Sequence, residues 1–409
     1  MFHKTAEIKV LRDPIHGYIH VEDQVIWDCI NAKEMQRLRR IHQLGGDFQI
    51  YHTAEHSRFS HSLGVYEIVR RMVHEILELS QQLSEYEKVA VMLAGLLHDI
   101  GHGPFSHAFE AISRRKHEEF TRKIITEDSE IHAILQKVHP HLSDDVANII
   151  SGTHQNDLLN QIISGQLDAD RMDYLLRDAY FTGTSYGHFD LERIIRTMRI
   201  VDQKLAVKES GIHSVEDYIM ARYHMYWQVY LHPVARSYEG LIAMLFHRMR
   251  DLYCTKRDSL NEVSMFHPFL SGQETSIDDL FCLDEAAAYY GFSLLRTHED
   301  AILRDLTRRV LDRDLFEYRT FTCEEDSEMI RVRLRTLNYD ERYYIFTDKA
   351  AEKLYSPYSR KDSGHNIWIL CEDHRVRELS EISDMVHAVC ASPTKEERKV
   401  YFPKEVMMD

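Results

Sequence analysis

The sequence is poor in the residues that interrupt helices or cross-link small domains. Its 409 residues include only 16 glycines, 8 prolines and 6 cysteines. The cysteines are scattered and form no Cys-x-x-Cys pair, which argues against a zinc ribbon or a disulfide framework. This usage is typical of reduced thiols in a cytosolic protein.

Long apolar segments are also missing. Residues 1–7 contain no hydrophobic region of a secretory signal. The longest apolar run, residues 89–97, has about half the length that a membrane-spanning helix needs. We therefore expect a cytoplasmic protein with no membrane partner.

The chain has fewer basic than acidic residues. The chain has 50 basic and 66 acidic residues, a formal net charge of −16. This balance argues against extensive nucleic-acid binding, which needs many neutralised phosphates. A small polyanionic substrate stays possible where a metal and a few arginines focus positive charge. The 26 histidines point the same way, because histidine is the commonest metal ligand.

The apolar spacing is mostly helical. Apolar residues recur at i, i+3 and i+4 over residues 65–77, and similar spacing marks 86–100, 118–137, 190–200 and 215–250. Residues 199–207 are an exception, with two short apolar runs around a polar turn that predict a hairpin. We expect a mainly α fold: a helical body over 1–250, a helical extension over 251–328 and a small α+β region over 329–409.

The period changes in the C-terminal part. Residues 274–328 carry 15 acidic against 6 basic residues, most simply explained as a solvated acidic face. After them, apolar residues alternate with arginines over 330–335, which predicts a half-buried strand. Residues 343–346 and 367–370 are its expected partners, and 376–390 resembles a closing helix.

The strongest chemical signal is the segment Leu97-His98-Asp99-Ile100-Gly101. An apolar helix runs into the His-Asp pair and is then broken by glycine and proline. An imidazole and a carboxylate at adjacent positions suit a first-row divalent ion. A simple hydrogen bond would also explain an isolated His-Asp pair, but so apolar a helix rarely buries an uncompensated aspartate. Residues 56–64 and 168–178 offer the further ligands that a catalytic site with open positions requires.

Several motifs in one order resemble the HD superfamily, specifically its deoxynucleoside triphosphate triphosphohydrolases. The resemblance is to the bacterial branch related to the vertebrate SAM-and-HD-domain enzyme, and it runs from about Val10 to at least Met249. It rests on Asp13-Pro14-Ile15-His16-Gly17, Gln36-Arg37-Leu38-Arg39, Gln43-Leu44-Gly45-Gly46, residues 56–64, residues 98–110, His117-Glu118 and residues 170–178. The C-terminal third matches far less distinctly.

The resemblance implies a role for each matching position. The implied products are a deoxynucleoside and inorganic triphosphate, with a divalent ion whose identity stays open among Mn, Fe, Mg, Co, Ni and Zn. The implied metal ligands are His61, His98, Asp99 and Asp170. The implied phosphate contacts are Arg58, His102, His117, Arg171 and Tyr174. The implied sugar contacts are Gln43, Leu44 and Tyr230, with Asp178 and Arg222 as a pair nearby.

His107 is implied as the acid that protonates the departing 5′-oxygen, oriented by Glu110. The residue types suit this chemistry independently of the resemblance. An alkoxide is a poor leaving group, so a positioned proton donor is valuable, and histidine titrates in the right range. His107 and Glu110 are three residues apart and are neighbours on a helix, where a carboxylate can keep an imidazole charged.

Enzymes of this kind also resemble one another in assembling as dimers of dimers with nucleotide effectors between subunits. We therefore expect a homo-oligomer, a tetramer, with an allosteric site. The matching positions here are Val10, Asn31, Gln36, Arg39, Arg199 and Lys208. Asn31 stands where guanine-reading relatives carry an aspartate. An amide offers one acceptor where a carboxylate offers two, so we expect a weakened guanine preference.

Two other functions stay open. The chain is alternatively an HD phosphohydrolase acting on nucleoside monophosphates or a signalling nucleotide, or a nucleotide-binding regulator without catalysis. The combination of Gln43 and Leu44 with Tyr230 favours dNTPs, and the intact motif residues disfavour an idle regulator.

Overall fold

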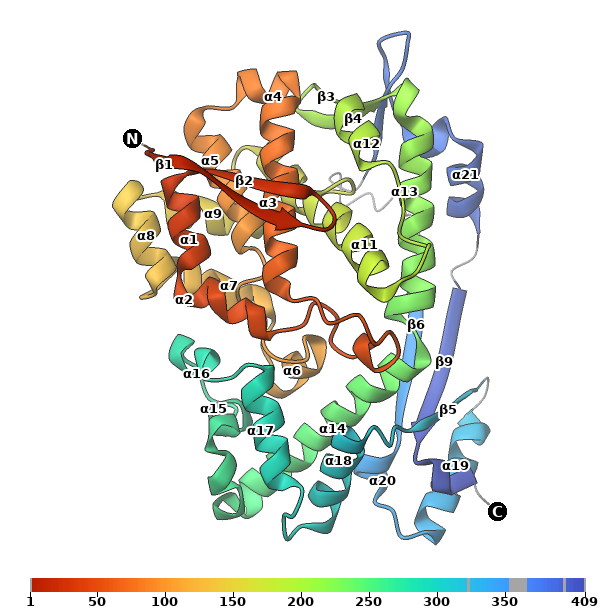
Figure 1. The fold of residues 1–409 in the computed structure, drawn as a ribbon. Coiled ribbons are helices and arrows are strands. Elements are labelled where there is room, and N and C mark those ends of the chain that lie inside the picture. Colours follow the sequence, from red (N-terminus) through yellow and green to blue (C-terminus); the bar gives the residue numbers. More distant parts are fainter. Residues whose placement is uncertain (1, 322–323, 353–365, 393–394, 408–409) are drawn as a thin grey trace.

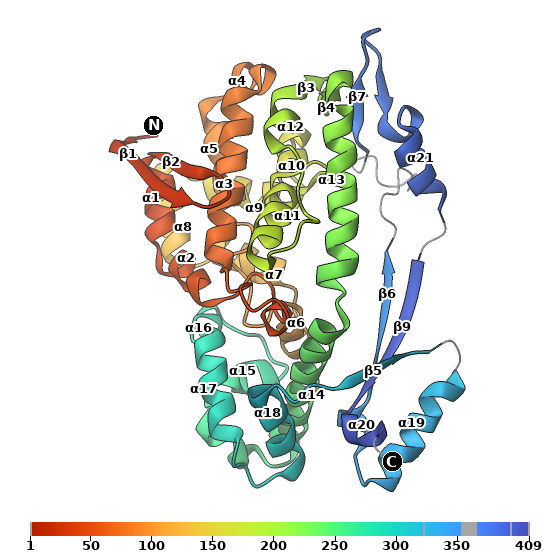
Figure 2. The same ribbon diagram turned by 45° about the vertical axis from the view of Figure 1, so that its right-hand side comes forward.

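The computed structural model describes residues 2–321, 324–352, 366–392 and 395–407. Over these residues the chain is mainly α-helical, as expected, and it contains three small sheets (Figure 1). Helices α1–α13 form the larger body, and α14–α18 form a second group beneath it (Figures 1 and 2). No described helix is long and apolar enough to cross a membrane.

Helices α1–α14 follow the apolar spacing closely. Their bounds are α1 Gln24–Asn31, α2 Lys33–Arg37, α3 Arg58–Glu75, α4 Leu77–Gln82, α5 Glu85–Leu97, α6 His107–Ser113, α7 His117–Thr126, α8 Glu130–Val138, α9 Leu142–Ile150, α10 Asp157–Ser164, α11 Ala169–Thr182, α12 Leu191–Thr197, α13 Ile212–Met225 and α14 Pro233–Thr255. The remaining helices are α15 His267–Leu270, α16 Ile277–Phe281, α17 Glu285–Leu295, α18 Ala301–Asp312, α19 Glu324–Thr336, α20 Glu341–Tyr344 and α21 Asp384–Ala391.

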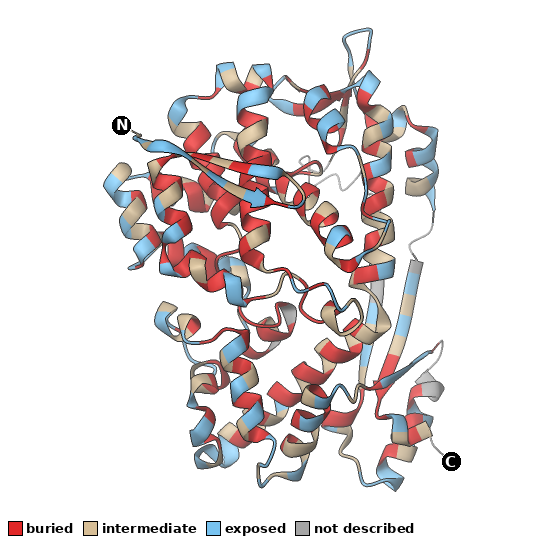
Figure 3. Cartoon of the chain, in the orientation of Figure 1, coloured by how far each residue is buried: buried red, intermediate tan, exposed pale blue. Residues whose placement is uncertain are grey.

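Helices α3, α5 and α11 pack together at the centre of the body, where burial is densest (Figure 3). Helix α5 begins with a capping box, in which Ser84 and Glu87 satisfy each other's backbone N–H groups. Gly64 lets α11 approach α3 closely, because a Cβ there would lie 1.9 Å from Asp173 Oδ1. This close packing brings the polar ends of the three helices together.

Two antiparallel hairpins flank the helices. Strand β1 (Lys4–Asp13) pairs with β2 (Gly17–Asp23), a hairpin that the helical expectation for residues 1–250 did not include. Strand β3 (Met198–Val201) pairs with β4 (Lys204–Lys208), which confirms the hairpin predicted at 199–207. Its turn residues Asp202 and Gln203 both have positive φ, as a tight two-residue hairpin turn requires.

The C-terminal strands join sheets that other parts of the chain begin. Strand β7 (Trp368–Leu370) lies parallel to β4 and antiparallel to β8 (Val376–Glu378). Strands β5 (Glu317–Thr320), β6 (Phe346–Glu352) and β9 (Lys395–Phe402) form another sheet, with β9 in the centre. The α+β region thus shares sheets with both preceding segments, and the division into three domains stays a prediction.

The strand predicted at 330–335 is wrong, because these residues lie in helix α19. Ile330 and Leu334 are buried and four residues apart, which places them on one helical face, whereas Val332 between them is 50% exposed. Three alternating apolar residues were too few to distinguish the two-residue period of a strand from the 3.6-residue period of a helix.

Other C-terminal boundaries also differ from the prediction. Residues 343–344 end α20, so the partner strand begins only at Phe346. Of residues 367–370, Trp368–Leu370 do form a strand, but its partners are β4 and β8. The helix predicted at 376–390 is confirmed only from Asp384, after a short strand.

Candidate active site

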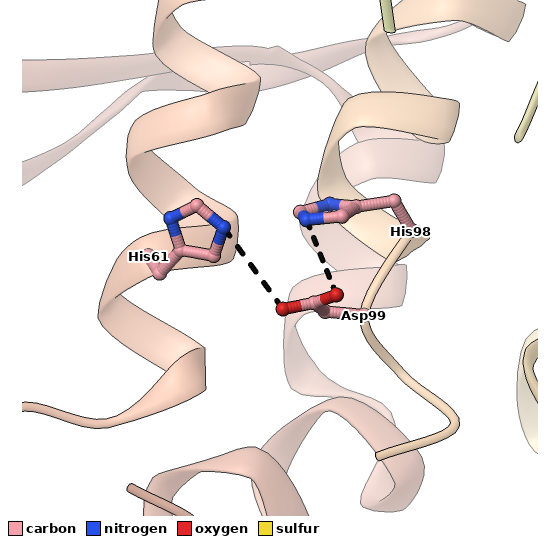
Figure 4. A group of neighbouring side chains, drawn as sticks. All are labelled: His61, His98 and Asp99. Carbon is pink, nitrogen blue, oxygen red and sulfur yellow. Dashed lines mark ion pairs between the residues drawn. The ribbon is translucent and has the colours of Figure 1, made fainter. Parts of the chain in front are cut away.

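The four predicted metal ligands come together where α3, α5 and α11 meet. His61 lies on α3, His98 and Asp99 follow α5, and Asp170 is in the first turn of α11. His61 Nε2 lies 3.0 Å from Asp170 Oδ1 and 3.9 Å from Asp99 Oδ2. His98 Nε2 lies 3.4 Å from Asp99 Oδ1 (Figure 4) and 3.5 Å from Asp170 Oδ1. Side chains from three segments distant in sequence thus converge on one point.

The cluster fits a divalent cation. His98 Nδ1 donates a hydrogen bond to the carbonyl oxygen of Gly95 at 2.9 Å, which leaves Nε2 as the nitrogen available to an ion. Among the described residues this buried Nε2 has no hydrogen-bond partner. First-row ions hold nitrogen and oxygen ligands at about 2.0–2.2 Å, which leaves neighbouring ligand atoms about 3 Å apart. The observed spacing agrees with that requirement.

The turn after α5 is fixed by α7. Thr121 Oγ1 accepts a hydrogen bond from Gly101 N (3.0 Å) and donates one to His98 O (3.1 Å). Gly101 leaves no room for a side chain, because a Cβ there would lie 2.3 Å from His117 O. The break that the sequence predicts after the His-Asp pair is therefore a packed, hydrogen-bonded turn.

The charges around Asp99 favour its ionised form. Burial opposes the charge, but His98 and then Arg58 hold the pKa of Asp99 well below its usual value. Arg58 forms an ion pair with Asp99 and donates to Ser106 Oγ at 2.8 Å. For His102, burial and the nearby Arg58 charge lower the pKa well below its usual value, so this imidazole is neutral.

His102 and His117 lie beside the cluster. His102 Nε2 is 3.4 Å from Asp99 Oδ1, and its ring stacks on His117 with centroids 3.7 Å apart. His117 Nδ1 lies 2.6 Å from Glu110 Oε1, so the carboxylate predicted to orient His107 also contacts His117. The side chain of His107 lies outside the described residues, and its role stays a prediction.

The residues predicted to contact the sugar form a second group next to the first. The rings of Tyr174 and Tyr230 meet edge to face at 5.9 Å, and the Tyr174 ring lies 6.5 Å from that of His61. Tyr230 donates to Asp178 Oδ2 at 2.8 Å, and His56 Nε2 lies 2.7 Å from Asp178 Oδ1. Tyr230 ends a π-helical turn between α13 and α14, a distortion frequent at functional sites.

The remaining predicted substrate contacts have identifiable neighbours. Leu44 is buried, and the side-chain oxygen of Gln43 is buried with no hydrogen-bond partner in the described part of the chain. Arg171 forms an ion pair with Asp168, and Arg222 donates to Gln166 Oε1 at 3.2 Å. The pairing of Asp178 with Arg222 stays a prediction.

The predicted effector residues occupy two places in the single chain. Arg39 Nε donates to Gln36 Oε1 at 2.8 Å, and Asn31 Nδ2 donates to Trp27 O at 2.7 Å. Arg199 and Lys208 lie on the β3–β4 hairpin, which is far from α1 and α2 (Figures 1 and 2). Val10 is exposed on β1, Arg199 lies 3.8 Å from Glu78, and Lys208 is exposed at the end of β4.

A buried network behind His61 was not assigned from the sequence. Asp173 accepts a hydrogen bond from His61 Nδ1 (2.8 Å) and lies 2.6 Å from His16 Nε2. Arg177 donates to Asp173 from Nε (2.8 Å) and Nη2 (2.9 Å), and to Asp13 Oδ2 from Nη1 (2.8 Å). Although burial opposes the charge, Arg177 and the two histidines hold the pKa of Asp173 well below its usual value.

This network orients a predicted ligand. A carboxylate that holds one imidazole nitrogen fixes the tautomer and leaves the other nitrogen for the ion. Asp173 does so for His61, and Asp13 connects it to the β1–β2 turn. The spacing of Asp170 and Asp173, three apart on a helix, was the available sequence signal.

Comparison with known proteins agrees with this geometry. A family model described as the HD domain matches residues 58–178, and one described as the HD associated region matches residues 189–267. The uncharacterized protein YwfO of Bacillus subtilis is 43% identical over 411 residues, covering 99% of this chain and 94% of that protein. This chain belongs to the HD-domain phosphohydrolase family. The matched HD region begins at Arg58 and ends at Asp178, which both lie in the site.

Relatives of this HD-domain chain include named enzymes and solved structures. Human deoxynucleoside triphosphate triphosphohydrolase SAMHD1 is 27% identical over 352 residues, covering 76% of this chain and 55% of that protein. The Dictyostelium discoideum SAMHD1 homolog is 32% identical, covering 58% of this chain and 49% of that protein. A crystal structure of a phosphohydrolase from Bacteroides thetaiotaomicron has a TM-score of 0.83 and 26% identity, covering 97% of this chain and all of that one.

Proposed function

We propose that this HD-domain chain hydrolyses dNTPs to a deoxynucleoside and inorganic triphosphate, with a divalent metal ion. The supporting observation is that the ligand cluster around Asp99 lies beside the tyrosine group that ends at Asp178. A triphosphate at the cluster would thus place its sugar near Tyr230. The relatives named as dNTP triphosphohydrolases support the same substrate class.

The proposed reaction is attack of water on the α-phosphorus. A bond forms between the water oxygen and phosphorus, and the bond from phosphorus to the 5′-oxygen breaks. When bound, the ion supplies Lewis-acid activation of the phosphoryl group and of water. His61, His98, Asp99 and Asp170 would hold it, and the sequence and geometry leave Mn, Fe, Mg, Co, Ni and Zn open.

The protein groups have separate roles in this proposal. Arg58 is a donor next to Asp99, placed to stabilise negative charge on the phosphates. Neutral His102 and the Glu110-bound His117 would contact other phosphate oxygens. His107 would transfer a proton to the departing 5′-oxygen, because an unprotonated alkoxide leaves poorly. Further phosphate contacts are assigned to Arg171, Tyr174 and Arg222.

Selection of the sugar is assigned to the second group. The Tyr230 hydroxyl is held by Asp178, so its ring is fixed where it would fill the space of a 2′-hydroxyl. The buried side-chain oxygen of Gln43 has no hydrogen-bond partner among the described residues, so it can accept a hydrogen bond from a 3′-hydroxyl. A ribonucleotide would therefore meet steric conflict, and a sugar lacking the 3′-hydroxyl would lose a partner.

The decisive experiment is a substrate profile of the purified chain with each metal. We expect free deoxynucleoside and triphosphate from dNTPs, little turnover of NTPs, and none by the Asp170→Ala variant. Turnover restricted to monophosphates or to a signalling nucleotide would favour the alternative HD phosphohydrolase. Metal and nucleotide binding without turnover of any nucleotide would favour a regulatory module.

Regulation by nucleotides is part of the proposal. A homotetramer would bring the Gln36–Arg39 pair of one subunit towards the basic hairpin residues of another, which a single chain holds apart. Phosphates bridging these groups would stabilise the assembly only while nucleotide is present. Light scattering with and without each dNTP tests this, and a fully active monomer would exclude it.

A further inference from the structure

The turn that precedes helix α6 has an unfavourable backbone conformation. Phe105 and Ser106 have φ values of 60° and 48°, in the left-handed region that residues with a Cβ rarely adopt. Such residues persist only where their surroundings hold them, and they cluster at functional sites. They directly precede His107, the predicted acid, so the contacts that hold this turn also set the start of α6.

Helix α17 packs one of its faces against this turn. The buried Phe105 ring meets Tyr289 edge to face at 5.4 Å and stacks on Phe292 at 5.8 Å. Glu285 Oε1 accepts a hydrogen bond from Phe105 N at 3.4 Å. Residues 285, 289 and 292 are spaced as one helical face. Helix α17 lies outside the matched HD and HD-associated regions, in the helical extension.

The same glutamate reaches a second loop of the site. Glu285 is 3% exposed, and its Oε1 also accepts from His42 N at 3.1 Å. Its Oε2 pairs with His42 Nδ1. His42 directly precedes Gln43 and Leu44, the predicted sugar contacts. The two loops touch as well, because a Cβ on Gly45 would lie 3.2 Å from Phe105 O.

A buried arginine connects the segment just before α17 to the loop that carries His102, beside the predicted metal ligands. Arg37 Nη2 donates to His102 O at 2.8 Å and to Leu283 O at 3.2 Å. Asp284, the N-cap of α17, forms an ion pair with Arg40. Residues 283–292 therefore contact both loops through a carboxylate and two aromatic rings, and Arg37 connects the carbonyl oxygen of Leu283 to that of His102.

We propose that Glu285 is a positioning residue of the active site, and that helix α17 completes the site from outside the HD domain. One carboxylate fixes the backbone of the His42 loop, which bears the sugar contacts, and of the Phe105 turn, which bears the acid. This inference rests on the proposed function for its catalytic consequence, but its structural part can be measured without substrate.

The test compares Glu285→Gln with Glu299→Gln, a matched change at an exposed glutamate of the same extension. Glutamine keeps the size of Glu285 but has only one acceptor oxygen. That oxygen can accept either from the two backbone N–H groups of Phe105 and His42 or from His42 Nδ1, so one set of contacts is lost. We expect kcat/KM for dNTPs to fall about 10–100-fold, as for other supporting residues of metal sites, with bound metal unchanged. Amide exchange of residues 40–46 and 102–109 should rise at least about tenfold. Neither quantity should change in Glu299→Gln.

Variants of two adjacent tyrosines distinguish a positioning role of α17 from a general loss of stability. Tyr289 packs on Phe105, whereas Tyr290 is 62% exposed on the same helix. Tyr289→Ala should lower kcat and leave KM within about twofold, because it disturbs the turn before the acid. Tyr290→Ala should change neither. Glu285→Gln should alter both kcat and KM, because it serves both loops.

Two results would overturn the proposal: kcat and KM within about twofold of wild type in Glu285→Gln, or unchanged exchange in both segments. If Glu285→Gln fails to fold, Glu285→Asp, one methylene shorter, is judged by the same criteria. A wild-type protein that hydrolyses no dNTP would instead refute the proposed function. Raised exchange in the variant would then still support the positioning of both loops.

Discussion

Replacing Asp173 by asparagine should weaken metal binding, although Asp173 is not a predicted ligand. Its carboxylate accepts from His61 Nδ1, contacts His16 Nε2 and takes two hydrogen bonds from Arg177. An amide has one acceptor oxygen and a donor group, so it cannot satisfy all three neighbours. His61 would then be free to rotate and to exchange its tautomer.

The expected loss follows from these contacts. Outer hydrogen-bond partners of ligands contribute about 10–100-fold to metal affinity, which corresponds to about 1.4–2.7 kcal/mol. Breaking a buried ion pair destabilises by about 3–5 kcal/mol. Arg177 keeps Asp13 as a partner, so we expect a loss in folding stability near the lower end of that range.

Chelator competition at 20 °C, well below unfolding, gives the metal affinity, and calorimetry gives the stability. Asp300→Asn is a matched control, because Asp300 also accepts two hydrogen bonds from one arginine, Arg248, in the α14–α18 contact. The control should lose stability but keep its metal affinity. Metal affinity within twofold of wild type in Asp173→Asn would refute the reasoning.

Four further predictions concern the site and its surroundings. Asp170→Ala should lose metal and activity together, whereas His107→Ala should keep metal and lose about 10²–10⁴-fold in kcat; metal analysis and kinetics decide, and an active His107→Ala enzyme would exclude the acid role. Wild-type enzyme should prefer dGTP to GTP, and Tyr230→Ala should narrow the difference; equal kcat/KM for both nucleotides in wild type would contradict the role of the ring. Although burial opposes it, two flanking carboxylates, Glu285 and Glu55, raise the pKa of His42 to about 9. Protonated His42 should therefore contribute up to about 3 kcal/mol to folding stability, in full below about pH 6.5 and lost as pH rises through 9. The denaturant midpoints of wild type and His42→Gln should converge above pH 9, and a gap that stays constant with pH would contradict this prediction. Because of Asn31, guanine nucleotides should not be the only effectors; hydrolysis of each dNTP alone and in pairs, showing activation by guanine nucleotides alone, would contradict this.

The sequence was sufficient for most of the helical body and for the His-Asp pair at the end of α5. Apolar spacing of 3.6 residues locates α3 and α5, and the His-Asp pair marks where α5 must stop. The hairpin at β3–β4 was predictable because its turn is short and polar. These features depend on neighbours in the chain, which a sequence displays directly.

The missed features depend on contacts between distant segments. His16 and Asp173 are 157 residues apart, and Glu285 lies 243 residues after His42. Nothing local distinguishes such a carboxylate from a surface acid. Strand β1 was missed for a different reason: its apolar residues Ile8 and Val10 face solvent, so it lacks the buried face that identifies strands.

The central claim is that water attacks the α-phosphorus of a dNTP and that the bond from this phosphorus to the 5′-oxygen breaks. Hydrolysis in ¹⁸O-labelled water tests it most directly, with mass spectrometry of both products. The account predicts one labelled oxygen in inorganic triphosphate and none in the deoxynucleoside. Label in the deoxynucleoside, or release of a monophosphate and pyrophosphate, would contradict it.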